Sequence, residues 1–337
     1  MHMADALISP AVGGTMWVVT AGTIAYCSAK VHQGLDDRKV PLMGVLGAFI
    51  FAAQMINFTI PATGSSGHIG GGLLLAILIG PHAAFLTIAS VLFIQALFFA
   101  DGGLLALGCN SFNLGIFPAF VAYPLIYKPL VGRRPRQSRL VATVVAAVIG
   151  LQLGAFAVVL ETVASGISAL PFAGFVLLMQ PIHLATGVIE GLATAAVVAF
   201  VYRARPELVE NTLQQRPLGN LPIRTLLIGL VVATVLLGGV VSWFASEHPD
   251  GLEWSLARMT GSEELPETKH GVHGLLAALQ EQRAFLPAYA LPSSGGDGKG
   301  TGAGRLGTSL SGIVGGIFTL ALCALVGFAL RKRPRKG

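Results

Sequence analysis

The chain has 337 residues, of which 53% are hydrophobic and only 11% are charged, and its mean hydropathy is +0.72. Soluble domains carry about a quarter charged residues, so this composition excludes an ordinary soluble domain and indicates a polytopic membrane protein. The net charge of +6 is informative only through the placement of the basic residues, and nothing in it supports nucleic-acid binding. Cys27, Cys109 and Cys323 lie far apart in apolar segments and are expected to be packing residues.

Apolar segments follow one another along the whole chain. They cover residues 11–29, 41–60, 69–80, 84–100, 111–127, 140–164, 172–202, 223–245 and 310–330. Most approach the ~20 residues that a membrane-spanning helix needs. The third reaches only about 18 Å at ~1.5 Å per residue, so we expect a partial span or a re-entrant piece there. The predicted fold is an all-α integral membrane helical bundle of about nine transmembrane segments.

Basic residues gather after the first, fifth, seventh and ninth segments. The clusters are Lys30, Arg38 and Lys39; Lys128, Arg133, Arg134, Arg136 and Arg139; Arg203, Arg205, Arg216 and Arg224; and residues 331–336. The positive-inside rule makes these clusters cytoplasmic, which predicts the N-terminus outside and the C-terminus inside. The outer loops are then the N-terminal residues, 61–68, 101–110, 165–171 and 246–309.

The chain starts with Met1, His2 and Met3. Initiator methionine is normally removed only before small residues, so we expect Met1 to stay, with its amine in chelating reach of the His2 amide and imidazole. The amine and amide close a five-membered ring on a metal, and the amide and Nδ1 close a six-membered ring. Three nitrogens in one plane suit Ni(II) or Cu(II), although a histidine here can also be an accident of the start codon.

The connection at residues 57–72 lies on the same predicted side of the membrane as His2, and its strong metal ligand is His68. Pro61 and several glycines predict a tight, irregular loop that is buried in protein or lines a cavity. A loop histidine alone is more often a surface residue, but paired with His2 it supplies the fourth nitrogen of a square plane. The side chains expected to fix its tautomer are Asn57, Thr63, Ser65 and Ser66.

Other polar residues have two interpretations each. Asp101 is either a turn and helix-capping carboxylate or an acceptor that orients a site histidine. Of Asn110 and Asn113, one is expected to cap the next helix and the other to close over the N-terminus. His183 and Glu190 share a helix face, at a depth expected to be nearer the inner half of the membrane. That depth favours an internal hydrogen-bond pair or a contact to a transport motor over a metal ligand.

Three motifs together carry a family resemblance: the start Met-His-Met-Ala-Asp-Ala, the Ser-Gly-His step that ends at His68, and the run Asp-Gly-Gly-Leu-Leu-Ala-Leu-Gly-Cys-Asn at 101–110. With matching stretches at 181–184 and 190–191, they make residues 1–205 resemble the CbiM/NikM family. Its members are the substrate-binding components of energy-coupling factor (ECF) nickel and cobalt transporters. The resemblance implies that the ion is held by the Met1 amine, the His2 amide and imidazole, and His68.

The last third of the chain resembles the small accessory component of that family, which has two transmembrane helices around an outer loop. The signature Pro-Asp-Gly-Leu-Glu stands at 249–253. We therefore expect a seven-helix metal-binding component at 1–205, a cytoplasmic linker at 206–222 and the two-helix component at 223–337. Its outer loop, 246–309, contains three histidines, for which solvation is favoured over a metal site because no closed four-ligand pattern exists. They are His248, His270 and His273.

No Walker A motif occurs in the sequence, so ATP-driven transport needs another protein. The resemblance implies a membrane coupling subunit and cytoplasmic ATPase subunits as partners, besides membrane lipid. It also implies Ni(II) or Co(II) as the transported substrate, no organic cofactor, and a place in the bacterial cytoplasmic membrane. A proton-coupled metal permease that uses His183 and Glu190 as a relay is the alternative. A membrane metalloenzyme ranks last, because four nitrogen ligands leave neither an open position nor a base.

Overall fold

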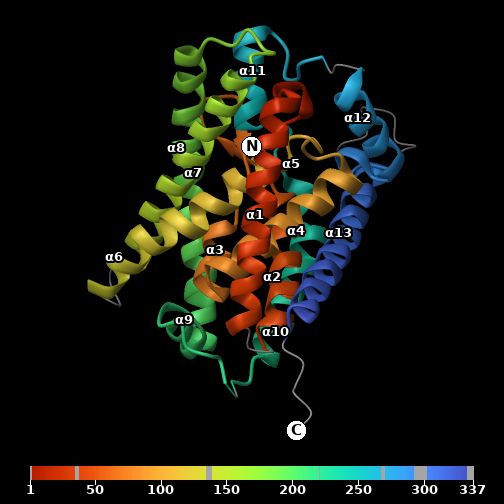
Figure 1. Cartoon of the computed structure of the whole chain (residues 1–337). Coiled ribbons are helices and arrows are strands. Elements are labelled where there is room, and N and C mark those ends of the chain that lie inside the picture. Colours follow the sequence, from red (N-terminus) through yellow and green to blue (C-terminus); the bar gives the residue numbers. More distant parts are fainter. Residues whose placement is uncertain are drawn as a thin grey trace.

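A computed structural model describes residues 2–34, 38–133, 139–219, 221–266, 270–291 and 302–331. These residues form a bundle of helices with one small antiparallel sheet (Figure 1). In chain order the elements are η1 (Asp5–Leu7), α1 (Pro10–Gly34), α2 (Lys39–Gln54), β1 (Phe58–Ile60), β2 (Ser65–Gly67), α3 (Gly72–Ile79), α4 (Pro81–Phe99), α5 (Leu107–Ser111), η2 (Phe112–Tyr127), α6 (Lys128–Arg133), α7 (Arg139–Ser165), α8 (Phe172–Ala204), α9 (Pro206–Leu213), α10 (Arg224–Gly239), η3 (Val241–Phe244), α11 (Gly251–Thr260), α12 (Gly271–Arg283), η4 (Pro287–Tyr289) and α13 (Gly302–Ala329).

Each predicted apolar segment contains a helix, so the helical membrane fold is confirmed. Among the described residues, five helical stretches are long and apolar enough to cross a membrane. They are Pro81–Phe99, Leu107–Gly132, Arg139–Ser165, Phe172–Ala204 and Gly304–Ala329. The helices α2 and α10 are apolar but shorter, with 16 residues each. The count of nine spans and the orientation of the termini stay predictions.

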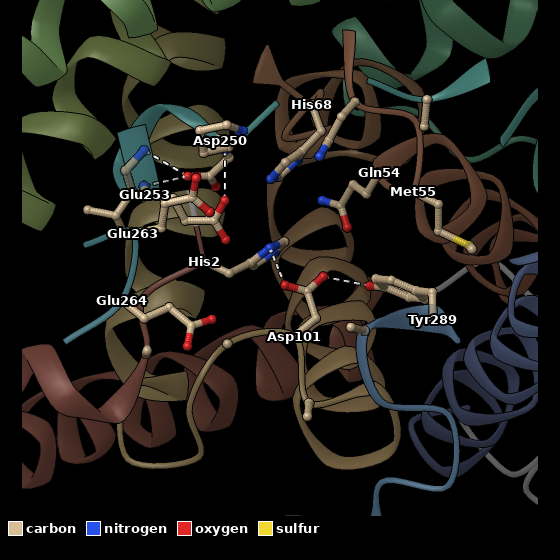
Figure 2. A pocket seen from close by; sticks show the side chains of 18 of the residues that line it. His2, Gln54, Met55, His68, Asp101, Asp250, Glu253, Glu263, Glu264 and Tyr289 are labelled. Atoms are coloured by element: carbon tan, nitrogen blue, oxygen red, sulfur yellow. Dashed lines mark hydrogen bonds and ion pairs between the residues drawn. The ribbon is translucent and has the colours of Figure 1, made fainter. Parts of the chain in front are cut away.

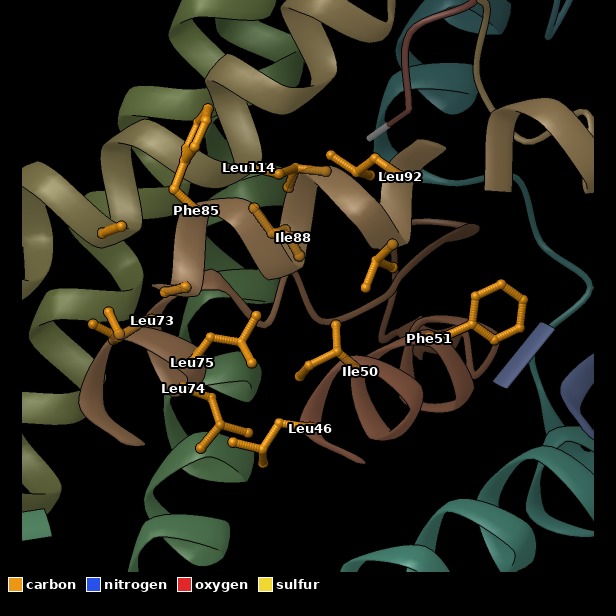
Figure 3. Packing of buried hydrophobic residues seen from close by; sticks show 14 of the residues in the cluster. Leu46, Ile50, Phe51, Leu73, Leu74, Leu75, Phe85, Ile88, Leu92 and Leu114 are labelled. Atoms are coloured by element: carbon orange, nitrogen blue, oxygen red, sulfur yellow. The ribbon is translucent and has the colours of Figure 1, made fainter. Parts of the chain in front are cut away.

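The third predicted segment becomes α3, a helix of eight residues that are all buried. At ~1.5 Å per residue it is about 12 Å long, which is too short to cross a bilayer. Figure 3 shows Leu46 and Ile50 of α2 turned toward Leu74 and Leu75 of α3, with Ile88 of α4 on the other side. The short helix is thus the centre of the apolar core, and its buried ends need polar partners from neighbouring elements.

The outer helices expose large apolar side chains. Val18 of α1 is 73% exposed, Leu177 of α8 is 72% exposed and Leu325 of α13 is 67% exposed. Apolar surface in water costs ~25 cal/mol per Å², so exposed apolar side chains on these helices fit a surface covered by lipid.

Figure 1 shows α11 and α12 at one end of the bundle, and α6 and α9 at the opposite end. The predicted outer loop is therefore folded, because its described residues form α11, α12 and η4. The predicted linker also contains a helix, α9, whose Leu208 and Val209 are buried. The Thr212 hydroxyl at its end donates to the Leu78 carbonyl at 3.0 Å, which ties α9 to the end of α3.

Candidate metal site

A cavity of about 600 Å³ lies between the N-terminal segment, the loop before α3 and residues of the ranges 242–265, 280–289 and 304–308. Figure 2 shows His2 and His68 facing this space from two directions, with carboxylates around them. The acidic residues in the lining are Asp101, Glu247, Asp250, Glu253, Glu263 and Glu264. A cavity with imidazoles at its wall and several carboxylates suits a cation. Met1, the other predicted ligand residue, lies outside the described residues.

The rings of His2 and His68 are neighbours, with centroids 4.9 Å apart and an angle of 8° between their planes. The His68 Nδ1 is 3.1 Å from the Ile69 carbonyl, which can only accept, so Nδ1 carries the hydrogen and Nε2 carries the lone pair. The His2 Nδ1 is 3.0 Å from Asp101 Oδ1. The His2 Nε2 is buried and has no hydrogen-bond partner among the described residues.

The predicted chelate needs His2 Nδ1 as a metal donor, whereas in the structure Nδ1 faces Asp101. Half a turn about the Cβ–Cγ bond exchanges Nδ1 with Cδ2 and Nε2 with Cε1. A ring nitrogen therefore lies on the Asp101 side of the ring in both orientations: Nδ1 in the structure, and Nε2 after the half turn.

Burial alone would raise the pKa of the Asp101 carboxyl, but the adjacent His2 ring and the Tyr289 hydroxyl hold that pKa well below its ordinary value. Asp101 is therefore an anion at neutral pH. Burial, reinforced by the neighbouring His2, lowers the pKa of the His68 imidazole to about 3. This ring is therefore neutral at physiological pH, which is the form that binds metals.

The N-terminal segment is fixed by hydrogen bonds between side chains and the main chain. Asn110 accepts from the Met3 N–H at 2.8 Å and donates to the Met3 carbonyl at 3.1 Å, so Asn110 is the asparagine that closes over this segment. The Ala106 N–H donates to Asp5 Oδ1 at 2.9 Å. A Cβ on Gly103 would lie 1.9 Å from Asp5 Oδ1, so only glycine allows this approach. The chain before α1 is thereby held with His2 at the cavity.

Asn113, the other predicted asparagine, also contacts the N-terminal segment. Its amide donates to Glu161 Oε2 at 2.8 Å and contacts the Met3 sulfur at 3.9 Å. Asn113 is thus a neighbour of the N-terminal segment in the core rather than of the two imidazoles.

The loop that carries His68 is anchored from α8 and α2. Glu190 accepts from the Gly70 N–H at 3.1 Å and from the Gly71 N–H at 3.0 Å, which satisfies donors at the buried start of α3. The Gln54 amide donates to the Gly70 carbonyl at 2.9 Å. His183 donates from Nδ1 to the Met179 carbonyl at 2.7 Å and lines a small second cavity together with His68.

The depth of His183 and Glu190 in the membrane stays a prediction. Both lie beside the His68 loop, because the irregular loop enters the bundle far enough to meet the middle of α8. A role in motor coupling stays a prediction.

The serines of the loop connect it to the last third of the chain. The Ser66 N–H donates to the Pro249 carbonyl at 2.8 Å, and its hydroxyl donates to the His248 carbonyl at 2.7 Å. The Ser65 hydroxyl is 2.8 Å from the Thr63 hydroxyl. The Asn57 carbonyl accepts from the Ser246 N–H at 2.7 Å. In the structure these polar groups dock segment 246–250, and the bond described for the His68 ring is to Ile69.

The Pro-Asp-Gly-Leu-Glu signature is a helix start. Asp250 caps α11 by accepting from the Leu252 and Glu253 N–H groups at 2.7 and 3.0 Å, and Glu253 accepts from the Asp250 N–H at 2.8 Å. This capping box is worth about 1 kcal/mol. Both carboxylates line the cavity, so the turn that starts α11 also places them near the imidazoles. Sequence reasoning missed this contribution, although the Asp-x-x-Glu spacing is a recognisable signal for it.

Tyr289 was also missed. Its hydroxyl donates to Asp101 Oδ2 at 2.5 Å, and the preceding helix contributes Gln280, which donates to the Gly102 carbonyl at 2.8 Å. Ala288 and Tyr289 both have a left-handed backbone, with φ of 49° and 60°, which costs on the order of 1–3 kcal/mol per residue. No local sequence signal marks this contact, because it joins two positions that are 188 residues apart.

Side chains alone do not complete a metal site in the part of the chain that the structure describes. No group of three histidine, cysteine, aspartate or glutamate side chains there is placed to hold a metal ion.

Comparisons with known proteins agree for both parts of the chain. The cobalt uptake substrate-specific transmembrane region, CbiM, matches residues 2–208, and the PDGLE domain matches residues 224–332. A protein of Archaeoglobus fulgidus named as a fused nickel transport protein, NikMN, is 32% identical over 99% of both chains. The cobalt transport protein CbiM of Sorangium cellulosum is 33% identical and covers 63% of this chain and 95% of its own.

A crystal structure of a truncated transition metal transporter has a similar fold. It superposes with a TM-score of 0.55 at 30% identity, over 60% of this chain and 99% of that one. The similarity therefore covers nearly all of that transporter.

Proposed function

We propose that this chain, which belongs to the CbiM family of cobalt uptake transmembrane regions, is the substrate-binding component of an ECF-type importer for Ni(II), Co(II) or both. A PDGLE domain follows the CbiM region in the same chain. It is a multi-pass membrane protein and a nickel or cobalt transport component rather than an enzyme. We further propose that it assembles with a membrane coupling subunit and cytoplasmic ATPase subunits, and that it lies in the bacterial cytoplasmic membrane.

The observation that carries the proposal is the pairing of His2 and His68 at one cavity, with ring centroids 4.9 Å apart. We propose that the ion takes four nitrogens: the Met1 amine, the His2 amide and Nδ1, and His68 Nε2. His68 Nε2 fits this role because Nδ1 is committed to the Ile69 carbonyl. Four nitrogens in a plane favour Ni(II), and Co(II) can share the site.

Nickel titration of the purified full chain tests the ligand set. His2→Ala and His68→Ala should each abolish tight binding, whereas His32→Ala, a matched histidine on the exposed part of α1, should not. Two alanines placed between an initiator methionine and Met1 should abolish it as well, because they move the amine away from His2. One residue would be a poor choice, since it creates an amine, two amides and an imidazole that chelate by themselves. Stoichiometric nickel in the extended chain would show that the terminal amine is not a ligand.

The energy source separates the proposal from a proton-coupled permease. Metal uptake by cells should stop on ATP depletion and persist when the proton gradient alone is collapsed. The opposite result would support the permease. Glu190 is a poor candidate for a proton relay, because each of its carboxylate oxygens accepts from a main-chain N–H.

A further inference from the structure

We propose that Tyr289, in the PDGLE part of the chain, is a positioning residue for the metal site that acts on His2 through Asp101. The inference rests on the proposed function, because it assigns the fused accessory part a side chain that orients a proposed metal ligand. Tyr289 itself is not a ligand in this proposal.

The contacts form a continuous chain from the accessory part to the imidazole. The Tyr289 hydroxyl donates to Asp101 Oδ2 at 2.5 Å, and Asp101 Oδ1 is 3.0 Å from His2 Nδ1. Each oxygen of the carboxylate therefore has its own partner. A carboxylate with one oxygen fixed cannot rotate freely, so the second oxygen is directed at the ring (Figure 2).

Tyr289 is itself held firmly. Its ring lies on Phe99, with centroids 5.1 Å apart and an angle of 23°, and it meets the edge of Phe51 at 6.2 Å. The strained left-handed backbone at Ala288 and Tyr289 turns the side chain inward. Backbone strain of this kind persists where the surrounding structure over-determines it, and it concentrates at functional sites.

A second residue of the accessory part, Gln280, allows docking of this part to be tested separately from positioning of Asp101. Gln280 donates from Nε2 to the carbonyls of Ala96 and Gly102, both at 2.8 Å. These bonds hold the accessory part against the turn that carries Asp101, but they do not reach the carboxylate. Gln280 therefore serves as the matched control for a purely structural contribution of this surface.

Metal-binding histidines are commonly oriented by a carboxylate on their second nitrogen, which fixes the tautomer and increases the basicity of the ligand. In the proposed chelate His2 binds the ion through Nδ1, and Nε2–H then donates to Asp101. The half turn about the Cβ–Cγ bond brings Nε2 to the former position of Cε1, on the side of the ring that faces this carboxylate. Tyr289 serves both orientations, because its bond to Asp101 does not depend on which nitrogen is presented.

The test is a double-mutant cycle on the full chain, purified in detergent and titrated with Ni(II). Tyr289→Phe removes only the hydroxyl, and Asp101→Asn removes the charge. We expect each to weaken Ni(II) binding about tenfold, the lower end of the range for residues that orient metal ligands. The double variant should bind as Asp101→Asn does, because Tyr289 acts only through that carboxylate. Additive losses would overturn the proposal, and so would wild-type affinity in Tyr289→Phe.

Two further readouts distinguish positioning from docking and from failure of the site itself. The visible absorption band of bound Ni(II) should shift alike in Tyr289→Phe and Asp101→Asn and stay unchanged in Gln280→Ala. An equal shift in Gln280→Ala would assign the effect to docking and overturn the proposal. If His2→Ala binds Ni(II) as well as the native chain, the proposed function fails. If only His2→Ala loses the ion and Tyr289→Phe does not, the function stands and the role of Tyr289 falls.

Discussion

Replacing Glu190 by glutamine tests whether the loop that carries His68 is held in place from α8. Its two oxygens accept from the Gly70 and Gly71 N–H groups at 3.1 and 3.0 Å, and only 1% of the residue is exposed. Glutamine keeps one acceptor oxygen but turns an NH₂ group toward the other N–H. One buried donor at the start of α3 therefore loses its partner.

The magnitude follows from that one lost bond. A hydrogen bond to a charged group contributes about 1.5–3 kcal/mol, and a buried donor without a partner costs about 1–3 kcal/mol. We take ~2 kcal/mol as the free-energy cost of the variant. This cost destabilises the loop, because the Gly70 and Gly71 N–H groups both belong to it. If the ion must restore the loop in order to reach His68, the affinity falls about 30-fold at ~1.4 kcal/mol per tenfold change.

The assay is calorimetric titration of the purified chain with Ni(II), with the unfolding temperature measured in parallel. Glu281→Gln, on the exposed face of α12, is the control for losing a carboxylate. A dissociation constant for Glu190→Gln within about threefold of the native value would refute the reasoning, because it would mean that the loop keeps its place without the second bond.

Three other substitutions test separate parts of the site. Gly103→Ala should weaken Ni(II) binding at least about tenfold, because its Cβ would lie 1.9 Å from Asp5 Oδ1 and displace the N-terminal segment; native affinity by titration would contradict this. Gly251→Ala places a Cβ 2.6 Å from the Ile182 side chain, so overpacking of about 1–3 kcal/mol should lower the unfolding temperature, and an unchanged value would show that α11 docks elsewhere. Burial and the neighbouring Asp250 raise the pKa of the Glu253 carboxyl above its ordinary 4.5. The folded state therefore retains this proton to a higher pH than the unfolded state, so the free energy of unfolding falls as pH rises from 4.5 toward neutrality. Glu253→Gln should flatten that decline in thermal melts between about pH 5 and pH 7, and an equal slope in both proteins would assign the decline to other groups.

Helix positions were predictable because their causes are local. Apolar runs of sufficient length form helices with internal hydrogen bonds wherever they pack, so every predicted segment contains one. The short third segment was also recognisable, since an apolar run at 69–80 reaches only about 18 Å and cannot span a bilayer. The outer segment 246–309 was predicted as a loop, because the helices of its described residues, α11 and α12, are amphipathic and short, and only the capping box at Asp250 marks a start.

The two histidines could be singled out from residue chemistry and the predicted side of the membrane. The residues that hold these histidines in place could not be predicted, because a hydrogen bond between positions far apart in the sequence produces no local sequence pattern. Glu190 was identified as an intramembrane acid, yet its partners at Gly70 and Gly71 depend on how deeply the loop enters the bundle.

The sequence by itself determined that the chain is a helical membrane protein. It also indicated that the nitrogen ligands at Met1 and His2 and the loop that carries His68 lie on the same side of the membrane. Apolar length, charge placement and ligand chemistry are properties of short stretches, and they survive without knowledge of packing. Only the tertiary structure decided that the accessory part covers this site, since Tyr289 reaches Asp101 and Ser66 reaches Pro249 across the fold. Those contacts arise from the packing of whole helices, which sums many weak apolar interactions that no single motif records.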